Sequence, residues 1–126
     1  MEPVQLFDLA SRQARWLSVR QAVIAGNVAN ANTAGFRPLD VEDFATVLSK
    51  STPSMVATNA RHLGGENPAS AVGLSERDSD VPVRPSGNSV RLEDELVKAG
   101  EIRRDFELNT AIVKAFHRMI LMAART

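Results

Sequence analysis

Two long stretches, one at each end of the chain, carry the residue spacing of a helical seam. In the first, positions recur at alternating steps of four and three residues, with a single polar member: Ala10, Ala14, Leu17, Gln21, Ile24, Val28 and Ala31. This alternation places every member on one face of an α-helix and is typical of helices that pack along their length. Pro3 suits a first helical turn, where its missing N–H is not needed. We therefore predict a helix from about residue 3 to residue 31.

The second seam lies near the C-terminus and also has one polar member, an asparagine. Its positions step by three and four residues: Ala99, Ile102, Phe106, Asn109, Val113, Phe116, Ile120 and Ala123. The capping residue stays open, since Ser86, Asn88 and Ser89 all qualify by type. The sequence predicts a helix from about residue 90 to residue 124. The expected fold is all-α, with the two long helices pairing as an antiparallel, coiled-coil-like element.

The stretch between the two helices is rich in proline, glycine and serine. Residues 49–89 contain four prolines and four glycines and show no sustained helical or strand period. We expect an irregular, flexible segment here. The run Val81–Val83 could be extended, but Pro82 would restrict it to the edge of a sheet. Together the segments form one domain with three parts: residues 1–34, 35–89 and 90–126.

The C-terminal helix is too apolar to be covered by one partner helix. Twelve of the eighteen residues 106–123 are apolar, and the polar ones form a narrow stripe. Such a helix needs cover on several sides, and other chains are the simplest source. We therefore expect an oligomer or a helical polymer. The residues predicted at its assembly interface come from both seams: Leu17, Ile24, Val28, Ile102, Phe106, Val113, Phe116 and Ile120.

A smaller arrangement remains open as an alternative. A short helix is predicted over Val41–Leu48, with Asp40 as its N-cap and Asp43 three residues further on. This helix could act as the third member of a three-helix bundle and cover part of the apolar surface. The chain would then need no partner for its core.

Composition argues against catalysis and against nucleic-acid binding. The 126 residues include 15 Lys and Arg and 15 Asp and Glu, a formal net charge of zero, whereas nucleic-acid proteins usually carry a basic surplus. Cysteine is absent, which excludes disulfides, thiolate metal sites and cysteine nucleophiles. His117 could be drawn as an acid–base partner of Glu101 or Asp105, but its place in the polar stripe favours a solvated histidine. His62 has no local partner, so we expect no enzyme, no cofactor and no metal site.

The junction after the first helix is the most specific part of the sequence. It reads I-A-G-N-V-A-N-A-N-T-A-G-F-R and ends at Arg37. Asn27, Asn30 and Asn32 precede Gly35, and asparagine and glycine are the residues that tolerate left-handed backbone and bond local main-chain groups. A helix should therefore end near Ala31 and turn in a defined way.

The same junction resembles the signature of the flagellar basal-body rod family. The residues that carry the resemblance are Asn27, Ala29, Asn30, Asn32, Thr33, Gly35, Phe36 and Arg37. Thr58–Leu63 and Asn88–Glu95 also resemble segments of the proximal member of that family. The family often has proline at the position of Ala34 and tyrosine at that of Phe36. It usually has an acidic residue at Arg91, so the start of the last helix is uncertain.

The resemblance implies a structural role without chemistry. Rod proteins pair their terminal helices and stack into the periplasmic shaft that joins the membrane ring to the hook, and motility depends on that shaft. The implied partners are other rod subunits, FlgC among them, the adaptor FliE, the membrane-ring protein and the flagellar export gate. No nucleic acid or small-molecule ligand is implied.

The resemblance also implies export through the flagellar type III apparatus without a cleaved signal. The N-terminus has no basic n-region and no uninterrupted apolar run, which agrees with that route. Two other functions remain open: a soluble coiled-coil adaptor or export chaperone, and a neighbouring rod protein such as FlgC.

Overall fold

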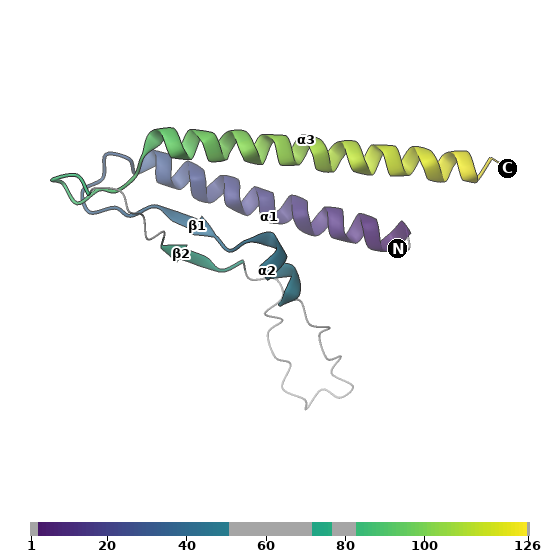
Figure 1. The fold of residues 1–126 in the computed structure, drawn as a ribbon, viewed down its shortest axis with the longest axis horizontal. Coiled ribbons are helices and arrows are strands. Elements are labelled where there is room, and N and C mark those ends of the chain that lie inside the picture. The colour runs from purple at the N-terminus through teal and green to yellow at the C-terminus, as the bar shows by residue number, and fades with distance from the viewer. Residues whose placement is uncertain (1–2, 51–71, 77–82, 126) are drawn as a thin grey trace, which may run out of the picture.

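Two long helices at the ends of the chain dominate the fold (Figure 1). The computed structural model describes residues 3–50, 72–76 and 83–125. Helix α1 is Pro3–Ala29 and helix α3 is Leu92–Ala123. The prediction of long N- and C-terminal helices is therefore confirmed, with ends within about two residues of those expected.

Helices α1 and α3 lie side by side and run in opposite directions (Figure 1). Contacts at three successive heights fix how they are aligned: Asn27 Nδ2 to Glu95 Oε2 at 2.9 Å, Asn109 Nδ2 to the Ala10 carbonyl at 3.0 Å, and the rings of Phe7 and Phe116 edge to face at 5.7 Å. Asn109, the polar member of the second seam, thus bonds the main chain of α1. Sliding one helix by a turn would break all of these contacts.

A two-stranded antiparallel sheet corrects the all-α prediction. Strand β1 is Leu39–Val41 and strand β2 is Leu74–Glu76, paired with Leu39 opposite Glu76 and Val41 opposite Leu74. Strands of three residues leave too short an alternation for a sequence pattern to reveal. Residues 81–82 of the expected extended run lie outside the described residues, and Val83 is exposed and belongs to no strand.

The short helix begins later than predicted. Helix α2 is Phe44–Ser49, and its N-cap is Asp43, without a bond from the cap side chain. Asp40 was the predicted cap, but it lies inside β1, where its Oδ1 accepts from the Val41 N–H at 2.8 Å. Asp40 therefore bonds within its own strand, and Asp43 takes the N-cap position of α2.

The core lies where α1 meets both α3 and the small sheet. Its buried side chains are Trp16, Leu17, Ile24, Val41 and Ile102. The indole Nε1 of Trp16 donates to the Glu42 carbonyl at 2.8 Å, which ties α1 to the end of β1. Parts of the three predicted segments 1–34, 35–89 and 90–126 contribute to this one core; their division stays an interpretation.

The buried face of α1 differs from the predicted seam in its second half. Gln21 and Val28 are exposed, whereas Trp16 and Asn27 are buried. The reason is that α1 is covered on two sides, by α3 and by β1 with α2, so its buried face is wider than a two-helix seam. A single seam drawn along the helix cannot represent both contacts.

Candidate functional site: the signature turn and the outer face of α3

Asn27, the first asparagine of the signature, is buried and completes the edge of the small sheet. Its Oδ1 accepts from the Leu39 N–H at 3.0 Å, and its Nδ2 donates to the Leu39 carbonyl at 2.7 Å. Nδ2 also donates to Glu95 Oε2 at 2.9 Å. One side chain thus imitates a strand partner for β1 and reaches the first turns of α3. This explains an asparagine inside a helix, where the residue is otherwise unfavourable.

Asn30 and Gly35 shape the turn that follows α1. Asn30 Nδ2 donates to the Gly26 carbonyl at 2.8 Å, and Asn30 Oδ1 accepts from the Thr33 hydroxyl at 3.1 Å. Gly35 has φ +73°, the left-handed region that favours glycine. The chain therefore turns directly after α1, and Asn30 and Gly35 form this turn by local bonds and backbone freedom.

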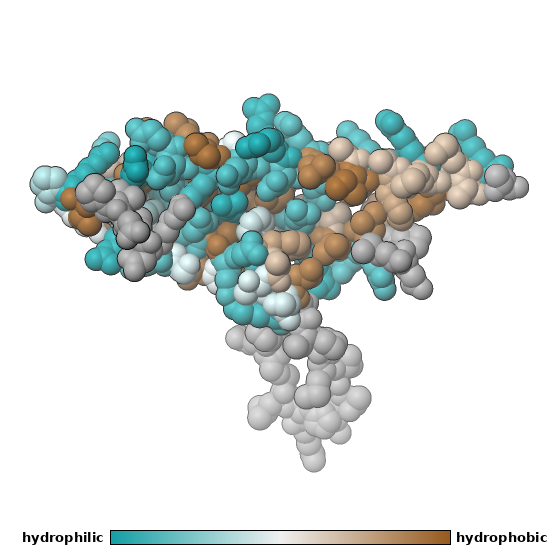
Figure 2. All heavy atoms as spheres, viewed as in Figure 1, coloured by the Kyte–Doolittle hydropathy of each residue, from teal (hydrophilic) through white to brown (hydrophobic). Residues whose placement is uncertain are grey.

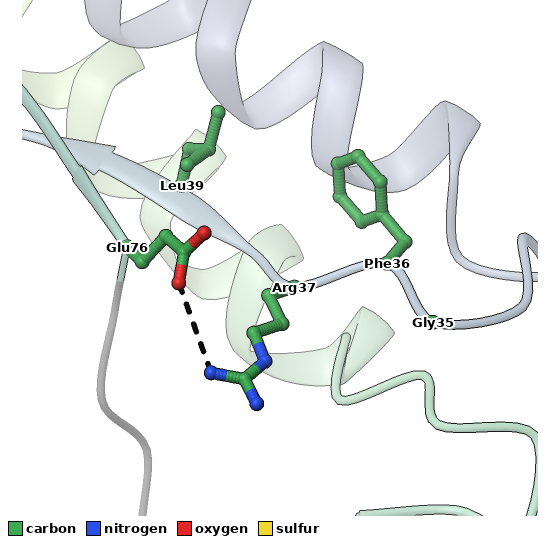
Figure 3. A pocket seen from close by; sticks show the side chains of 5 residues that line it. All are labelled: Gly35, Phe36, Arg37, Leu39 and Glu76. Carbon is green, nitrogen blue, oxygen red and sulfur yellow. Dashed lines mark ion pairs between the residues drawn. The ribbon is translucent and has the colours of Figure 1, made fainter.

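The remaining signature residues lie on the surface or line a hollow beside the sheet. Ala29 and Asn32 are exposed. In Figure 3, the side chains of Phe36 and Leu39 point toward α1, whereas Arg37 faces Glu76, 3.7 Å away. The open hollow between them has a volume of about 430 Å³. Both partners of this ion pair are largely exposed, so the pair adds little to stability.

A buried charge network connects α1, β1 and α3. Lys98 Nζ lies 3.2 Å from Glu95 Oε1 and 3.1 Å from Asp40 Oδ2. Arg20 Nε lies 3.5 Å from Asp40 Oδ1. Glu95 and Lys98 are almost fully buried, and within the described residues no buried polar side-chain atom lacks a partner. Sequence reasoning missed this network because its members come from three elements.

The network determines the charge state of Asp40. Burial opposes ionisation, but the hydrogen bond from Lys98, the bond from the Val41 N–H and the charges of Lys98 and Arg20 outweigh it. The pKa of Asp40 therefore lies below its ordinary value of 3.8. A lowered folded-state pKa adds stability above the unfolded value, and this stability is lost as the pH falls through the folded value.

We expect Asp40→Asn to lower the free energy of unfolding at neutral pH by about 1.5–3 kcal/mol, the range for a hydrogen bond to a charged group. The variant should also lose the part of the acid destabilisation that the lowered pKa of Asp40 implies for the native chain below about pH 4. Urea unfolding at pH 7, 5 and 3 measures both effects. Asp43→Asn is the control, because Asp43 is exposed and makes no ion pair in the described part of the chain. Equal acid sensitivity of Asp40→Asn and the native chain would contradict the expectation.

The eight residues predicted at the assembly interface have different environments. Leu17, Ile24 and Ile102 are buried in the core of the single chain, and Phe106 packs against that core. Val113, Phe116 and Ile120 are half-buried on the side of α3 that faces α1, and Val28 is exposed. Their role between subunits stays a prediction. At least five of the eight already have intrachain partners: Leu17, Ile24, Ile102, Phe106 and Phe116.

A second row of apolar residues runs along α3, away from α1. Its members repeat the same steps of four and three residues and are all exposed: Leu108, Ile112, Ala115, Met119 and Met122. We call this row the outer apolar stripe. Its four large members are 45 to 62% exposed, and Figure 2 shows apolar residues gathered over the second half of α3. A row of this kind on one chain marks a contact surface.

No group of three or more metal-ligating side chains occurs in the described ranges, and His117 is exposed there without an ion pair to Glu101 or Asp105. His62 and the segment Thr58–Leu63 lie outside the described residues. No helix among those described is long and apolar enough to cross a bilayer.

The end of α1 and the turn that follows it match a known class of protein. Residues 11–37 match the model of a family described as "Flagella basal body rod protein". The match covers most of α1 and the whole signature turn, so it identifies the class by the residues whose geometry is described above.

A full-length relative narrows the assignment. The "Flagellar basal body rod protein FlgB" of Agrobacterium fabrum is 45% identical over 129 residues, which cover 99% of this chain and 96% of the relative. The chain therefore belongs to the FlgB family of flagellar basal body rod proteins. It is a structural rod component of the flagellar basal body, where it assembles with other rod and basal-body components to support motility.

Proposed function

We propose that this chain is the proximal subunit of the rod and that it joins the rod by burying the outer apolar stripe of α3 against neighbouring subunits. The observation that carries the proposal is the exposure of Leu108, Ile112 and Met119 on a helix whose adjacent face is already packed on α1. In the rod, α1 and α3 would extend their pairing into coiled-coil-like contacts with other chains, and Val28 would join that contact from α1.

The energetics favour such a contact. Moving a large aliphatic side chain from water into a packed interior contributes about 1.5–3 kcal/mol. The four large members of the outer apolar stripe are about half exposed in the single chain. Burying them between subunits would therefore contribute about half of that free energy for each side chain. Their heptad-like spacing fits another helix along its length, whereas a compact substrate would need a concave site.

The partners proposed for these contacts are FlgC and further rod subunits, the adaptor FliE, the membrane-ring protein and the export gate. Their support is family membership together with a stripe that is free in the single chain. The proposed route to the periplasm is the flagellar type III apparatus without a cleaved signal. Because the chain has no cysteine, no disulfide has to be broken before it passes through this apparatus or formed afterwards.

Cysteine footprinting tests the proposal, because the chain has no cysteine of its own. Met119→Cys should react with a maleimide freely in the purified chain and at least about tenfold more slowly in isolated basal bodies, where burial would shield the thiol. Thr46→Cys on α2 provides the comparison on the far side of the molecule, and motility of each variant strain confirms that it still assembles. Equal labelling rates of Met119→Cys in both states would contradict the proposed interface. Absence of the chain from purified basal bodies would favour a soluble adaptor or chaperone.

A further inference from the structure

Two turns that are distant in the sequence close on each other where α1 ends and α3 begins. One is the signature turn, residues 30–36, and the other is residues 84–90, which we call the return turn. The Gly35 N–H donates to the Ser86 carbonyl at 3.0 Å, and the Ser89 N–H donates to the Phe36 carbonyl at 3.2 Å. The two turns are thus joined main chain to main chain.

Asn88 lies at the centre of this contact and is only 1% exposed. Its Nδ2 donates to the carbonyls of Asn30 at 2.9 Å and Thr33 at 2.7 Å, and its Oδ1 accepts from the Val90 N–H at 2.8 Å. Each of these carbonyls also accepts a local main-chain N–H, from Thr33 at 3.0 Å and from Phe36 at 3.3 Å, so Asn88 adds a second donor to each. Each polar atom of this amide is therefore used inside the chain.

The two glycines explain how closely the turns approach. Gly35 and Gly87 have φ of +73° and +80°. A Cβ on Gly87 would lie 3.2 Å from the Gly35 Cα, tighter than ordinary contact. The close approach therefore requires glycine at position 87, for its backbone conformation and for its lack of a side chain.

The contact continues into the first turns of α3. Glu95 is buried and accepts from Asn27 Nδ2, the same atom that bonds the Leu39 carbonyl, and its other carboxylate oxygen faces Lys98. The start of α3 is thereby held to the end of α1 and to β1. Arg91, the N-cap residue, makes no capping hydrogen bond, and its ion pair with Asp94 at 3.9 Å lies on the surface, so the alignment of α3 depends mainly on these tertiary contacts.

We propose that the rod signature is one half of an intrachain clasp and that Asn88, Gly87 and Glu95 form the other half. The clasp sets the alignment of α3 on α1. Asn88 and Glu95 are positioning residues: neither belongs to the outer apolar stripe, and they act by holding that stripe at a fixed place relative to α1. The clasp is a property of the free chain, so it stands apart from the proposed contacts in the rod.

The competing role for the signature is direct binding of a neighbouring subunit. Three of its polar groups already have partners within the chain: Asn27 bonds Leu39 and Glu95, Asn30 bonds Gly26, and the Gly35 N–H bonds Ser86. A neighbour would have to displace these bonds in a partly or fully buried setting, which is unfavourable. The signature is therefore better suited to organising its own chain.

Crosslinking distinguishes the two roles. Ala34→Cys and Ser86→Cys place thiols at two exposed positions that the Gly35–Ser86 bond brings together, and no native cysteine interferes. A short bismaleimide should give an internal crosslink that runs at monomer size, both in the purified chain and in isolated basal bodies. Single-cysteine variants control for accidental pairing. A dimer-sized product in basal bodies would overturn the intrachain clasp.

A second measurement tests the positioning role itself. Spin labels at Ser11→Cys and His117→Cys, both exposed, report how α3 lies along α1. Asn88→Ala should broaden the distance distribution or shift it by about 5 Å, one helical turn. The matched control is Asn32→Ala, because Asn32 is an exposed signature asparagine without a side-chain hydrogen bond in the described residues; it should leave the distance unchanged. An unchanged distance in folded Asn88→Ala would reduce Asn88 to a stabilising residue and overturn the proposal. If that variant does not fold, Asn88→Ser, which keeps one donor, takes its place.

Discussion

Replacing Ile112 by aspartate should abolish swimming and leave the isolated chain folded. Ile112 is 45% exposed in the single chain, so the change should lower the free energy of unfolding of the isolated chain by only about 1 kcal/mol. In an assembled rod, the same aspartate would be buried without a partner. An unpaired buried charge costs several kcal/mol, and the burial of the isoleucine is lost as well. Rod assembly should therefore decrease by a factor of a hundred or more, counted at about 1.4 kcal/mol per tenfold.

The measurement pairs thermal unfolding of the purified variant with motility in soft agar and counting of basal bodies. Thr110→Asp is the matched control, since Thr110 is exposed on the same helix but outside the outer apolar stripe. Met119→Asp should behave like Ile112→Asp, because both residues lie in the stripe. Normal swimming of the Ile112→Asp strain would show that the outer apolar stripe is not part of the assembly interface.

Alanine at two glycines of the same chain should change stability in opposite directions. Gly87→Ala should lower the free energy of unfolding by about 1–3 kcal/mol, since a left-handed residue acquires a Cβ and that Cβ meets Gly35. Gly100→Ala should raise it by about 0.5–1 kcal/mol, because Gly100 lies inside α3 and its added Cβ would have no described atom within 4 Å.

Chemical denaturation of both variants beside the native chain measures the two effects, and the opposite signs make each variant the control of the other. Because small domains have little stability in reserve, the Gly87→Ala strain should also swim poorly. A destabilised Gly100→Ala chain would show that α3 is bent or strained at that glycine. An unaffected Gly87→Ala chain would show that the two turns separate easily.

The long helices could be predicted because their information is local and repeated. Leu17, Ile24 and Ile102 were placed in packing seams, and the structure buries all three. The end of α1 could be predicted for a similar reason, since Asn30 and Gly35 act on backbone within a few residues of themselves. Spacing and residue type are sufficient where the partner is a neighbour in sequence.

The missed features depend on partners that are distant in sequence. Asn88 looked like a helix cap, whereas it holds the carbonyls of Asn30 and Thr33. Asp40 looked like a cap as well, and it pairs with Lys98. Nothing in the local sequence distinguishes an asparagine or aspartate that bonds its own turn from one that bonds another segment. These side chains could be assigned only after the elements had been placed in space.

The outer apolar stripe was overlooked for a different reason. The sequence indicates that α3 is apolar around most of its circumference. The predicted seam through Phe106 and Phe116 accounts for only one side of that apolar surface. Leu108, Ile112 and Met119 carry the same periodicity on the adjacent face. The strands were missed because three residues cannot establish a period, and β2 lies in a stretch of irregular composition.

The helix pair has two unlike ends, and this asymmetry gives growth a direction. At one end the signature and return turns close over the helices; at the other, the last turn of α3 extends past the start of α1 (Figure 1). Copies of such a subunit that point the same way along the axis meet through unlike ends. This head-to-tail contact is the geometry that produces open filaments unless the ring closes. The polarity of the shaft would then already be present in the shape of one subunit.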